Sequence, residues 1–404
     1  MSVFKTEGGS KMRASTKKSQ FVALFVVFLV MAIGFGSGFG SDEQVMEIWH
    51  WQEDWRLGGE DESFIFASIS KVLLGHDNNL YILDGRSSKI YVVAVADGKH
   101  QRTISISGEG PGELSFSGNM FLMGDEHIGL LRTTPAKIVY IDYQGKPGPS
   151  IYLNENPSGM FLSTFAKWQN GILVIAGSNS IPGETWLGQY VEYGEKFRYV
   201  NYPLRSLFLE QKLVEEDTYF YSYKPWDLDK DGNLYLAPYW GDKSKNEYHF
   251  NVYDTQGKKL REISHEFEPY ERSNEEKRLA KASLVGGVED LKMMESLGGE
   301  CVVEDIAPNI FDITIHSDGR IWVETSRSAK NQPEGIFKTY DIFLPSGEFS
   351  HRVALALPAN GEKDIVYFIS DDQLIVVKGQ KDILSFGAYP DADVLEIICY
   401  SLSR

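Results

Sequence analysis

Short apolar strands separated by turn-forming residues recur along this chain, and this repetition limits the fold more than any other feature. In the clearest example, the turn Asp229–Asn233 leads into the apolar segment Leu234–Ala237, and the alternating segment His249–Tyr253 leads into a second turn at Asp254–Gly257. Alternating apolar and polar residues between Asp, Asn and Gly turns are typical of antiparallel strands. Together with the residues before the first turn and Lys258–Ile263 after the second, this stretch predicts a four-stranded antiparallel unit.

Similar units recur about six times, but the last one is incomplete. Five complete units are expected at 64–106, 120–153, 164–202, 226–263 and 311–355. The sixth has three strands: Asp364–Ile369, Gln373–Lys378 and Val394–Ser401. A Trp-rich alternating segment, Val45–Leu57, has no neighbouring partner and can supply the missing outer strand. A ring of radial sheets that closes in this way hides its open edge. The sequence therefore predicts an all-β fold, a six-bladed β-propeller closed by an N-terminal strand.

One segment departs from the strand pattern. Tyr270–Leu297 loses the alternation, and Ser273-Asn-Glu-Glu276 is typical of a helix N-terminus with carboxylates in its first turn. Gly286-Gly287 and Gly298-Gly299 would end two short helices. We expect a small helical insertion between blades, at about 270–297, and a partly helical polar link at Leu204–Asp217.

The N-terminus predicts export. Lys17-Lys18 precede the apolar run Phe21–Ile33, and small residues follow up to Gly40, which is the pattern of a secretory signal. The uncharged run could instead remain as a membrane anchor. We therefore expect residues 1–40 to be a signal peptide or N-terminal anchor and residues 41–404 to be the propeller. This places the protein in the periplasm or at the cell surface, touching a membrane only through an uncleaved N-terminal segment.

The charge and the cysteines narrow the class of protein. The formal net charge is −17 over 404 residues, and such a surface repels nucleic acid. The two cysteines, Cys301 and Cys399, could form one disulfide in an oxidising compartment. The interpretation we favour is two buried, unpaired thiols, because a core of this size needs no covalent link.

Several stretches resemble a known family. Trp55-Arg-Leu-Gly-Gly-Glu-Asp-Glu, Leu80-Tyr-Ile-Leu-Asp84, Lys89-Ile-Tyr-Val-Val and Gly108-Glu-Gly-Pro-Gly-Glu-Leu114 resemble the six-bladed β-propellers among exported bacterial proteins, which are similar to NHL-repeat propellers. The resemblance runs from about Val45 onward and implies the fold and an exported location. It implies no activity. Many such relatives carry a lipid-anchoring cysteine after the leader, and this chain lacks it.

Asp227, Asp229 and Asp231, followed by Gly232, have the spacing of the first half of a calcium loop. Such a loop also needs a bidentate Glu at its twelfth position, which is Pro238 here. The alternative is an ordinary strand-to-strand turn, as at His76–Asn79. No cofactor is predicted, although a divalent metal remains an open hypothesis at these three residues.

The loop between the first two blades carries Glu109 and Glu113. Its glycines permit tight backbone angles, and Pro111 fixes one of them. The two carboxylates could lie beside a ligand, or Glu113 could bond backbone amides within a rigid crossover. No Lys-Ser/Thr follows, so the loop is not a phosphate loop.

The sequence contains no complete catalytic set. The eight histidines are scattered and no Gly-x-Ser-x-Gly elbow occurs. We therefore expect a non-catalytic module that binds a protein, peptide or glycan outside the cytoplasm. One alternative is a metal-dependent hydrolase or lactonase, with Asn119, Asn170 and Asn309 near the channel mouth. A sensor ectodomain held by an uncleaved leader is a further alternative.

Overall fold

The computed structural model describes residues 46–403 except 60–63, 109, 111–112, 115–118, 133–136, 153–160, 170–171, 180–183, 192–195, 204–211, 215–224, 238–245, 256–257, 286–287 and 381–394. For parts of β9 and β10 and for β11 to β14 it gives the backbone path only. Residues 45–404 form one compact unit. The predicted leader lies outside the described residues. Within the described part, no helix is both long and apolar enough to cross a bilayer.

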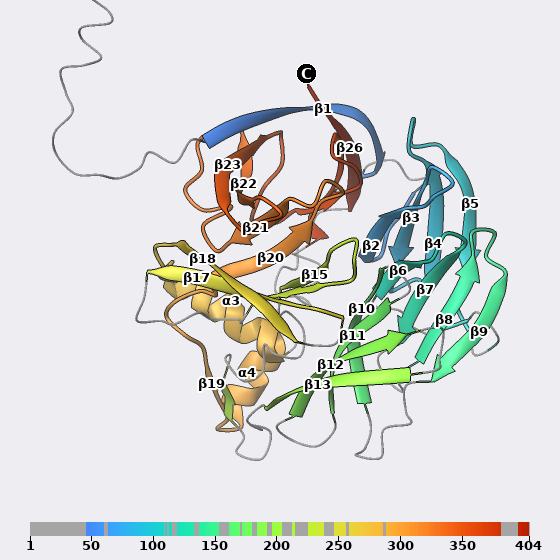
Figure 1. Ribbon diagram of the computed structural model, residues 1–404. Helices are drawn as coiled ribbons and strands as arrows, with labels where there is room; N and C mark the ends of the chain where they lie inside the picture. The colour runs from blue at the N-terminus through green and yellow to red at the C-terminus, as the bar shows by residue number, and fades with distance from the viewer. Residues whose placement is uncertain are drawn as a thin grey trace, which may run out of the picture. The chain divides into compact units, whose positions relative to one another are not determined.

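Antiparallel sheets of four strands, each built from consecutive strands, make up the first four blades (Figure 1). Blade 1 comprises β2 (Ile69–Leu74), β3 (Asn79–Asp84), β4 (Lys89–Ala94) and β5 (His100–Ser105). Blade 2 comprises β6 (Asn119–Met123), β7 (His127–Arg132), β8 (Lys137–Asp142) and β9 (Pro147–Tyr152). Blade 3 comprises β10 (Phe161–Gln169), β11 (Ile172–Asn179), β12 (Glu184–Val191) and β13 (Lys196–Pro203). Blade 4 comprises β15 (Trp226–Leu228), β16 (Leu234–Leu236), β17 (Glu247–Tyr253) and β18 (Lys259–Glu266).

The last two blades share one strand. Blade 5 comprises β20 (Ile310–Ile315), β21 (Ile321–Thr325), β22 (Ile336–Phe343) and β23 (Phe349–Ala356). Blade 6 comprises β24 (Ile365–Phe368), β25 (Gln373–Lys378), β26 (Glu396–Leu402) and the N-terminal strand β1 (Met46–Gly58). From Trp51 to Gly58, β1 pairs antiparallel with β26, so the predicted closure by an N-terminal strand is confirmed. From Met46 to His50, β1 also pairs parallel with β23, which the sequence did not predict.

Apolar residues gather between neighbouring blades. Leu80, Ile82 and Val93 of blade 1 pack with Ile375 and Val377 of blade 6, and separate clusters join blades 1 and 2, 4 and 5, and 5 and 6. The first strands of the blades contact one another in turn around the axis, from β2 through β6, β10 and β15 to β20. The fold is therefore a six-bladed β-propeller in which β2, β6, β10, β15, β20 and β24 are the innermost strands.

The direction of the strands assigns every connection to one of two faces. Because strands alternate in direction, the connection from the outer strand of one blade to the inner strand of the next lies at the same end as the loop between a blade's second and third strands. We call this the crossover face. The turns between first and second strands, and between third and fourth strands, lie at the opposite face.

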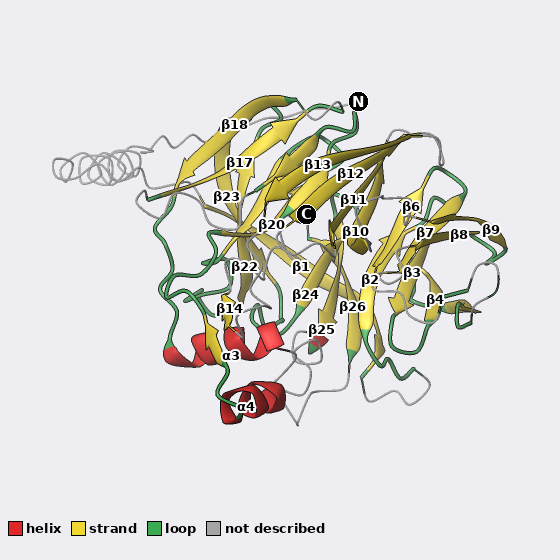
Figure 2. Cartoon of the chain, turned by 90° about the horizontal axis from the view of Figure 1, so that it is seen from below, coloured by secondary structure: helices red, strands yellow, loops and turns green. Residues whose placement is uncertain are grey.

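The predicted helical insertion is present on the crossover face. It comprises α3 (Asn274–Val285) and α4 (Val288–Ser296), which lie side by side at the edge of the strands (Figure 2). The Ser273 side chain accepts a hydrogen bond from Glu276 N (3.2 Å), and the Glu276 carboxylate accepts one from Ser273 N (2.8 Å), a complete capping box. Ala282, Leu291 and Cys301 form its small core.

A short parallel pair accompanies the helices. It joins β14 (Lys212–Val214) to β19 (Glu300–Val302). The expected partly helical link at Leu204–Asp217 was therefore wrong for residues 212–214, whose backbone hydrogen bonds are made to another segment of the chain, and its other residues lie outside the described part. Cys301 and Cys399 are both buried and form no disulfide, as favoured from the sequence.

Candidate functional site

In the loop between blades 1 and 2, one of the two glutamates, Glu113, makes hydrogen bonds within the loop itself. The carboxylate of Glu113 accepts a hydrogen bond from Gly110 N (2.8 Å), and Glu113 N donates to Gly110 O (3.1 Å). Gly108 has a φ of +140°, and a Cβ there would collide with the Glu113 carboxylate. The contacts of Glu113 thus hold the crossover together. Glu109 lies outside the described residues, and a ligand at either carboxylate stays a prediction.

The three aspartates of the calcium hypothesis have different surroundings. Asp229 accepts hydrogen bonds from the backbone N of Asp231 and of Asn233, both at 2.9 Å, within a turn closed by Asp229 N to Asn233 O (3.0 Å). The same closure joins Gly75 to Asn79 in blade 1. Asp231 is exposed, and Asp227 lies in β15 with protein partners on both carboxylate oxygens.

No three His, Cys, Asp or Glu side chains meet in a way that could hold a metal ion, among the residues that the structure describes. The contacts at Asp227 and Asp229 favour the turn interpretation. Calcium at these residues stays an untested hypothesis.

Four charged side chains from four blades converge at the propeller axis. Lys71 comes from β2, Lys167 from β10, Asp227 from β15 and Asp312 from β20. The charge of Asp312 interacts electrostatically with those of the other three, and Lys71 also lies over the Tyr367 ring of β24, 5.5 Å from its centroid. Lys71 of blade 1 thus interacts with residues of blades 3, 4, 5 and 6, and only a position near the axis is close to all of them. These residues therefore form an axial cluster of both signs.

Two members of the axial cluster have shifted pKa values. Burial raises the pKa of Asp312 to about 6, and the negative charges of Glu324 and Asp227 add to this, while Lys167 and Lys71 oppose it. Burial and the neighbouring Lys167 lower the pKa of Lys71 to about 8. Asp312 nevertheless keeps an exposed surface. Asp312 is thus surrounded by protein but still accessible to water, as expected for a residue in the wall of a narrow channel.

Behind Asp312, a buried pair completes the charge arrangement. Lys338 Nζ lies 2.7 Å from Glu324 Oε1, and the Tyr340 hydroxyl donates to Glu324 Oε2 (3.3 Å). Burial and the Glu324 charge raise the pKa of Tyr340 well above its usual value. Since the axial cluster contains two lysines as well as two aspartates, a divalent cation there would face repulsion from Lys71 and Lys167.

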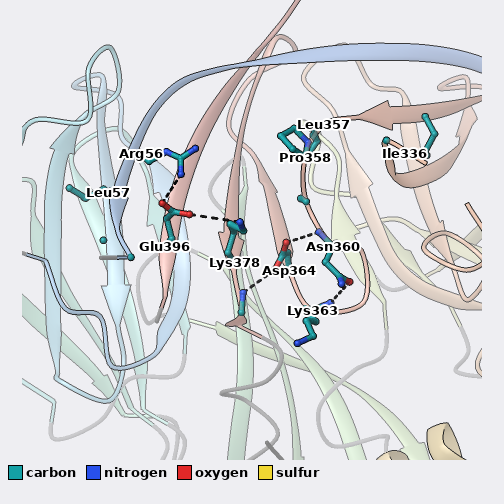
Figure 3. Close-up of a pocket in the computed structure, with 15 residues that line it drawn as sticks. Arg56, Leu57, Ile336, Leu357, Pro358, Asn360, Lys363, Asp364, Lys378 and Glu396 are labelled. Atoms are coloured by element: carbon teal, nitrogen blue, oxygen red, sulfur yellow. Dashed lines mark hydrogen bonds and ion pairs between the residues drawn. The ribbon is translucent and has the colours of Figure 1, made fainter. Parts of the chain in front are cut away.

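A cleft with a volume of about 990 Å³ opens on the crossover face between blades 5 and 6. Its walls come from the C-terminal end of β1, the connection from β23 to β24, the start of β22, the end of β25 and the start of β26. Figure 3 shows side chains from both sides of this opening. The cleft is lined by Arg56–Gly59, Gly335–Ile336, Leu357–Asn360, Lys363–Asp364, Lys378–Gly379 and Glu396.

Charged residues form two sides of the cleft (Figure 3). On one side, Glu396 lies 3.1 Å from Arg56 Nη1 and 3.9 Å from Lys378 Nζ. On the other, buried Asp364 accepts hydrogen bonds from Gly379 N (2.9 Å) and Asn360 N (2.7 Å). Among the described residues that line the cleft, none has an aromatic side chain. The carboxylates of Glu396 and Asp364 have protein partners. Much of the remaining lining consists of glycine, alanine and proline residues.

Sequence reasoning missed the axial cluster and the cleft. A signal for the cluster was present, since Lys71 and Asp312 are each the third residue, and the one charged residue, of an innermost strand. The cleft had no comparable signal, because its walls come from segments that are far apart in the sequence and only ring closure brings them together.

Comparison with known proteins supports the fold. Residues 60–225 match a family model, DUF5128, described as a 6-bladed beta-propeller. A DUF4221-family member from Bacteroides vulgatus superposes with a TM-score of 0.54 at 12% identity, covering 88% of this chain and 98% of that one. The calcium-binding protein regucalcin from Agrobacterium tumefaciens gives 0.46 at 11% identity, covering 89% and 98%.

A virginiamycin B lyase from Staphylococcus aureus gives a TM-score of 0.43 at 12% identity, covering 86% of this chain and 99% of that one. No curated protein is detectably similar in sequence. The resemblance to six-bladed propellers that the sequence indicated is confirmed. At these identities, the solved structures bear on the fold alone.

Proposed function

We propose that this chain is an exported, non-catalytic β-propeller that binds an extended peptide segment of a partner protein in the cleft between blades 5 and 6. The observation that carries the proposal is the cleft itself, an opening of about 990 Å³ with small residues on its walls and charges on two sides. Pockets of 300 to about 1,000 Å³ are typical of ligand sites. Export rests on the leader pattern of residues 1–40.

The lining favours a peptide over a glycan. Sugar rings are commonly held against aromatic faces, and none of the lining residues that the structure describes is aromatic. A peptide needs polar partners and compensating charges, and the lining supplies polar and charged side chains through Asn360, Lys363 and the pair Arg56–Glu396. The mixed signs on its sides would fix the direction of a bound segment rather than select for one net charge.

The helical insertion extends the same face. Lys330 contacts Glu276 of α3 (2.7 Å) and also Glu362, which lies in the connection that lines the cleft. The Lys330 side chain thus links the insertion to one wall of the opening. A partner whose segment lies in the cleft would contact the insertion as well, giving an interface larger than the cleft alone.

Site-specific photo-cross-linking tests this proposal. A benzophenone amino acid replaces Lys363 at the cleft, and in the matched control it replaces Lys258, an exposed lysine in the turn between β17 and β18 at the opposite face. We expect a protease-sensitive adduct with a defined polypeptide from the Lys363 position and none from Lys258. A glycan adduct, or equal adducts from both positions, would contradict the proposal.

A further inference from the structure

Lys71 and Asp312 lie at the axis without neutralising each other. Among the described residues, Lys71 makes no hydrogen bond and no ion pair, and its close contact is the face of Tyr367. The Asp312 carboxylate accepts one long hydrogen bond from the Thr314 hydroxyl of its own strand (3.4 Å) and makes no ion pair with any described residue. By contrast, Lys167 is held by Asp227 at 2.8 Å. Charges surrounded by protein are normally paired.

The backbone aims these two side chains. The pairing of β2 with β3 shifts register between Ile69 and Lys71, and that of β20 with β21 shifts between Ile310 and Asp312. Both irregularities fall at the same place, immediately before the charged residue and toward the crossover face. Bulges redirect side chains and are frequent beside functional sites. The two blades therefore use one device to present opposite charges at the axis.

Aromatic side chains accompany the two charges. Phe311 precedes Asp312 and is 46% exposed, which is unusual for a large apolar residue on an innermost strand. Tyr367 belongs to β24, in the blade between those that carry Lys71 and Asp312. The axial site thus offers a cation, an anion and apolar surface, contributed by blades 1, 5 and 6.

We propose that Lys71, Phe311, Asp312 and Tyr367 form a binding site for a small zwitterion, an α-amino acid, whose ammonium group contacts Asp312 and whose carboxylate contacts Lys71. A divalent cation would be repelled by Lys71 and Lys167, and a simple anion by Asp312 and Asp227. A molecule carrying both charges satisfies both free groups at once. An apolar side chain on the amino acid would pack against Phe311.

The site has a defined dependence on pH. The groups around Asp312 are Lys71, Lys167, Asp227, Glu324 and the hydroxyls of Tyr340 and Tyr367. Those around Lys71 are Lys167, Asp312, Asp227 and the Tyr367 ring. Asp312, with its pKa of about 6, loses its charge as the pH falls through that value. Binding of the ammonium group should weaken below about pH 6, and an Asp312→Asn variant should lack this acidic limb.

Calorimetric titration of the full chain with L-phenylalanine tests the proposal. We expect phenylacetate, which lacks the ammonium group, and phenethylamine, which lacks the carboxylate, to bind at least about tenfold more weakly. Lys71→Met and Asp312→Asn should each lower the affinity for L-phenylalanine by a similar factor. Lys99→Met and Asp97→Asn, at an exposed ion pair between β4 and β5, should change the affinity by less than about twofold.

Equal affinity for all three probes, unchanged binding by both axial variants, or no binding of L-phenylalanine at about 1 mM would overturn the proposal. Unchanged melting temperatures of the variants show that lost binding does not reflect unfolding. The cleft is a separate site, so Lys363→Trp should leave this binding intact, and either proposal can fail without the other.

Discussion

Asp227 joins three blades through one carboxylate. Its Oδ1 lies 2.8 Å from Lys167 Nζ of blade 3, and its Oδ2 accepts a hydrogen bond from Ile315 N of blade 5 (2.8 Å). The residue itself belongs to blade 4. Its side chain is 16% exposed, so water cannot fully replace these partners. An acidic residue that sequence spacing placed in a calcium loop is thus positioned as a link between inner strands.

Replacing Asp227 tests this link. Asp227→Ala should lower the free energy of unfolding by about 2–4 kcal/mol, because it leaves Ile315 N without its partner and removes the ion pair of Lys167. Asp231→Ala, at an exposed turn position, should change it by less than about 0.5 kcal/mol. Urea unfolding without added metal measures both. A second measurement is made with added calcium. If both variants lose the same unfolding free energy, and only when calcium is present, the calcium hypothesis is favoured instead.

At the scale of elements, the helical insertion is attached by a cluster around the first turn of α3. The Tyr270 hydroxyl donates to the Glu276 carboxylate (3.1 Å), Ser273 N donates to it, and Lys330 contacts it from blade 5. Burial disfavours the charged form of Glu276, but the hydrogen bonds from Lys330 and Ser273 outweigh this and lower its pKa to about 2. One carboxylate therefore caps the helix and holds it to the propeller.

This attachment predicts acid sensitivity. The pKa of Glu276 is lower in the folded chain than in the unfolded chain, so its contribution is complete above about pH 4.5 and is lost as the pH falls toward 2. We expect the free energy of opening of α3, measured by hydrogen exchange of its amides, to fall by about 2–3 kcal/mol over that range. Glu276→Gln should remove most of this pH dependence.

Glu275 provides the matched control. It is the neighbouring glutamate in the same first turn, but its carboxylate contacts only Arg278 among the described residues. Glu275→Gln should leave the protection of α3 within about 0.5 kcal/mol of the wild type at neutral pH. Equal loss of protection in both variants would mean that the helix dipole, rather than the contacts of Glu276, sets the stability of α3.

At the scale of the whole molecule, β1 closes the ring and shapes the candidate site. Trp51 of this strand packs in the cluster between blades 5 and 6, and Trp55 in the cluster between blades 6 and 1. Trp55 Nε1 also donates to Val95 O of blade 1 (2.8 Å). The C-terminal end of β1, Arg56–Gly58, also lines the cleft, so the strand that closes the ring forms part of the candidate site.

The blades, the closing strand and the helical insertion could be predicted because their signals are local. Alternation and turn residues mark each strand, and the residues around Ser273 mark the start of α3. The parallel pairing of Met46–His50 with β23 could not be predicted, since a short run of alternating residues pairs equally well in either direction. The meeting of Lys71 with Asp312 depends on ring closure and on two bulges, which no single segment records.

The affinity of the cross-linked peptide for cleft variants tests the central claim most directly. Lys363→Trp places a large ring at the cleft, and Lys258→Trp makes the same substitution at the opposite face. If the cleft between blades 5 and 6 is the binding site, Lys363→Trp should lower the affinity for the purified peptide by at least about tenfold, and Lys258→Trp should lower it by less than about twofold. Equal affinities of the two variants would contradict the account.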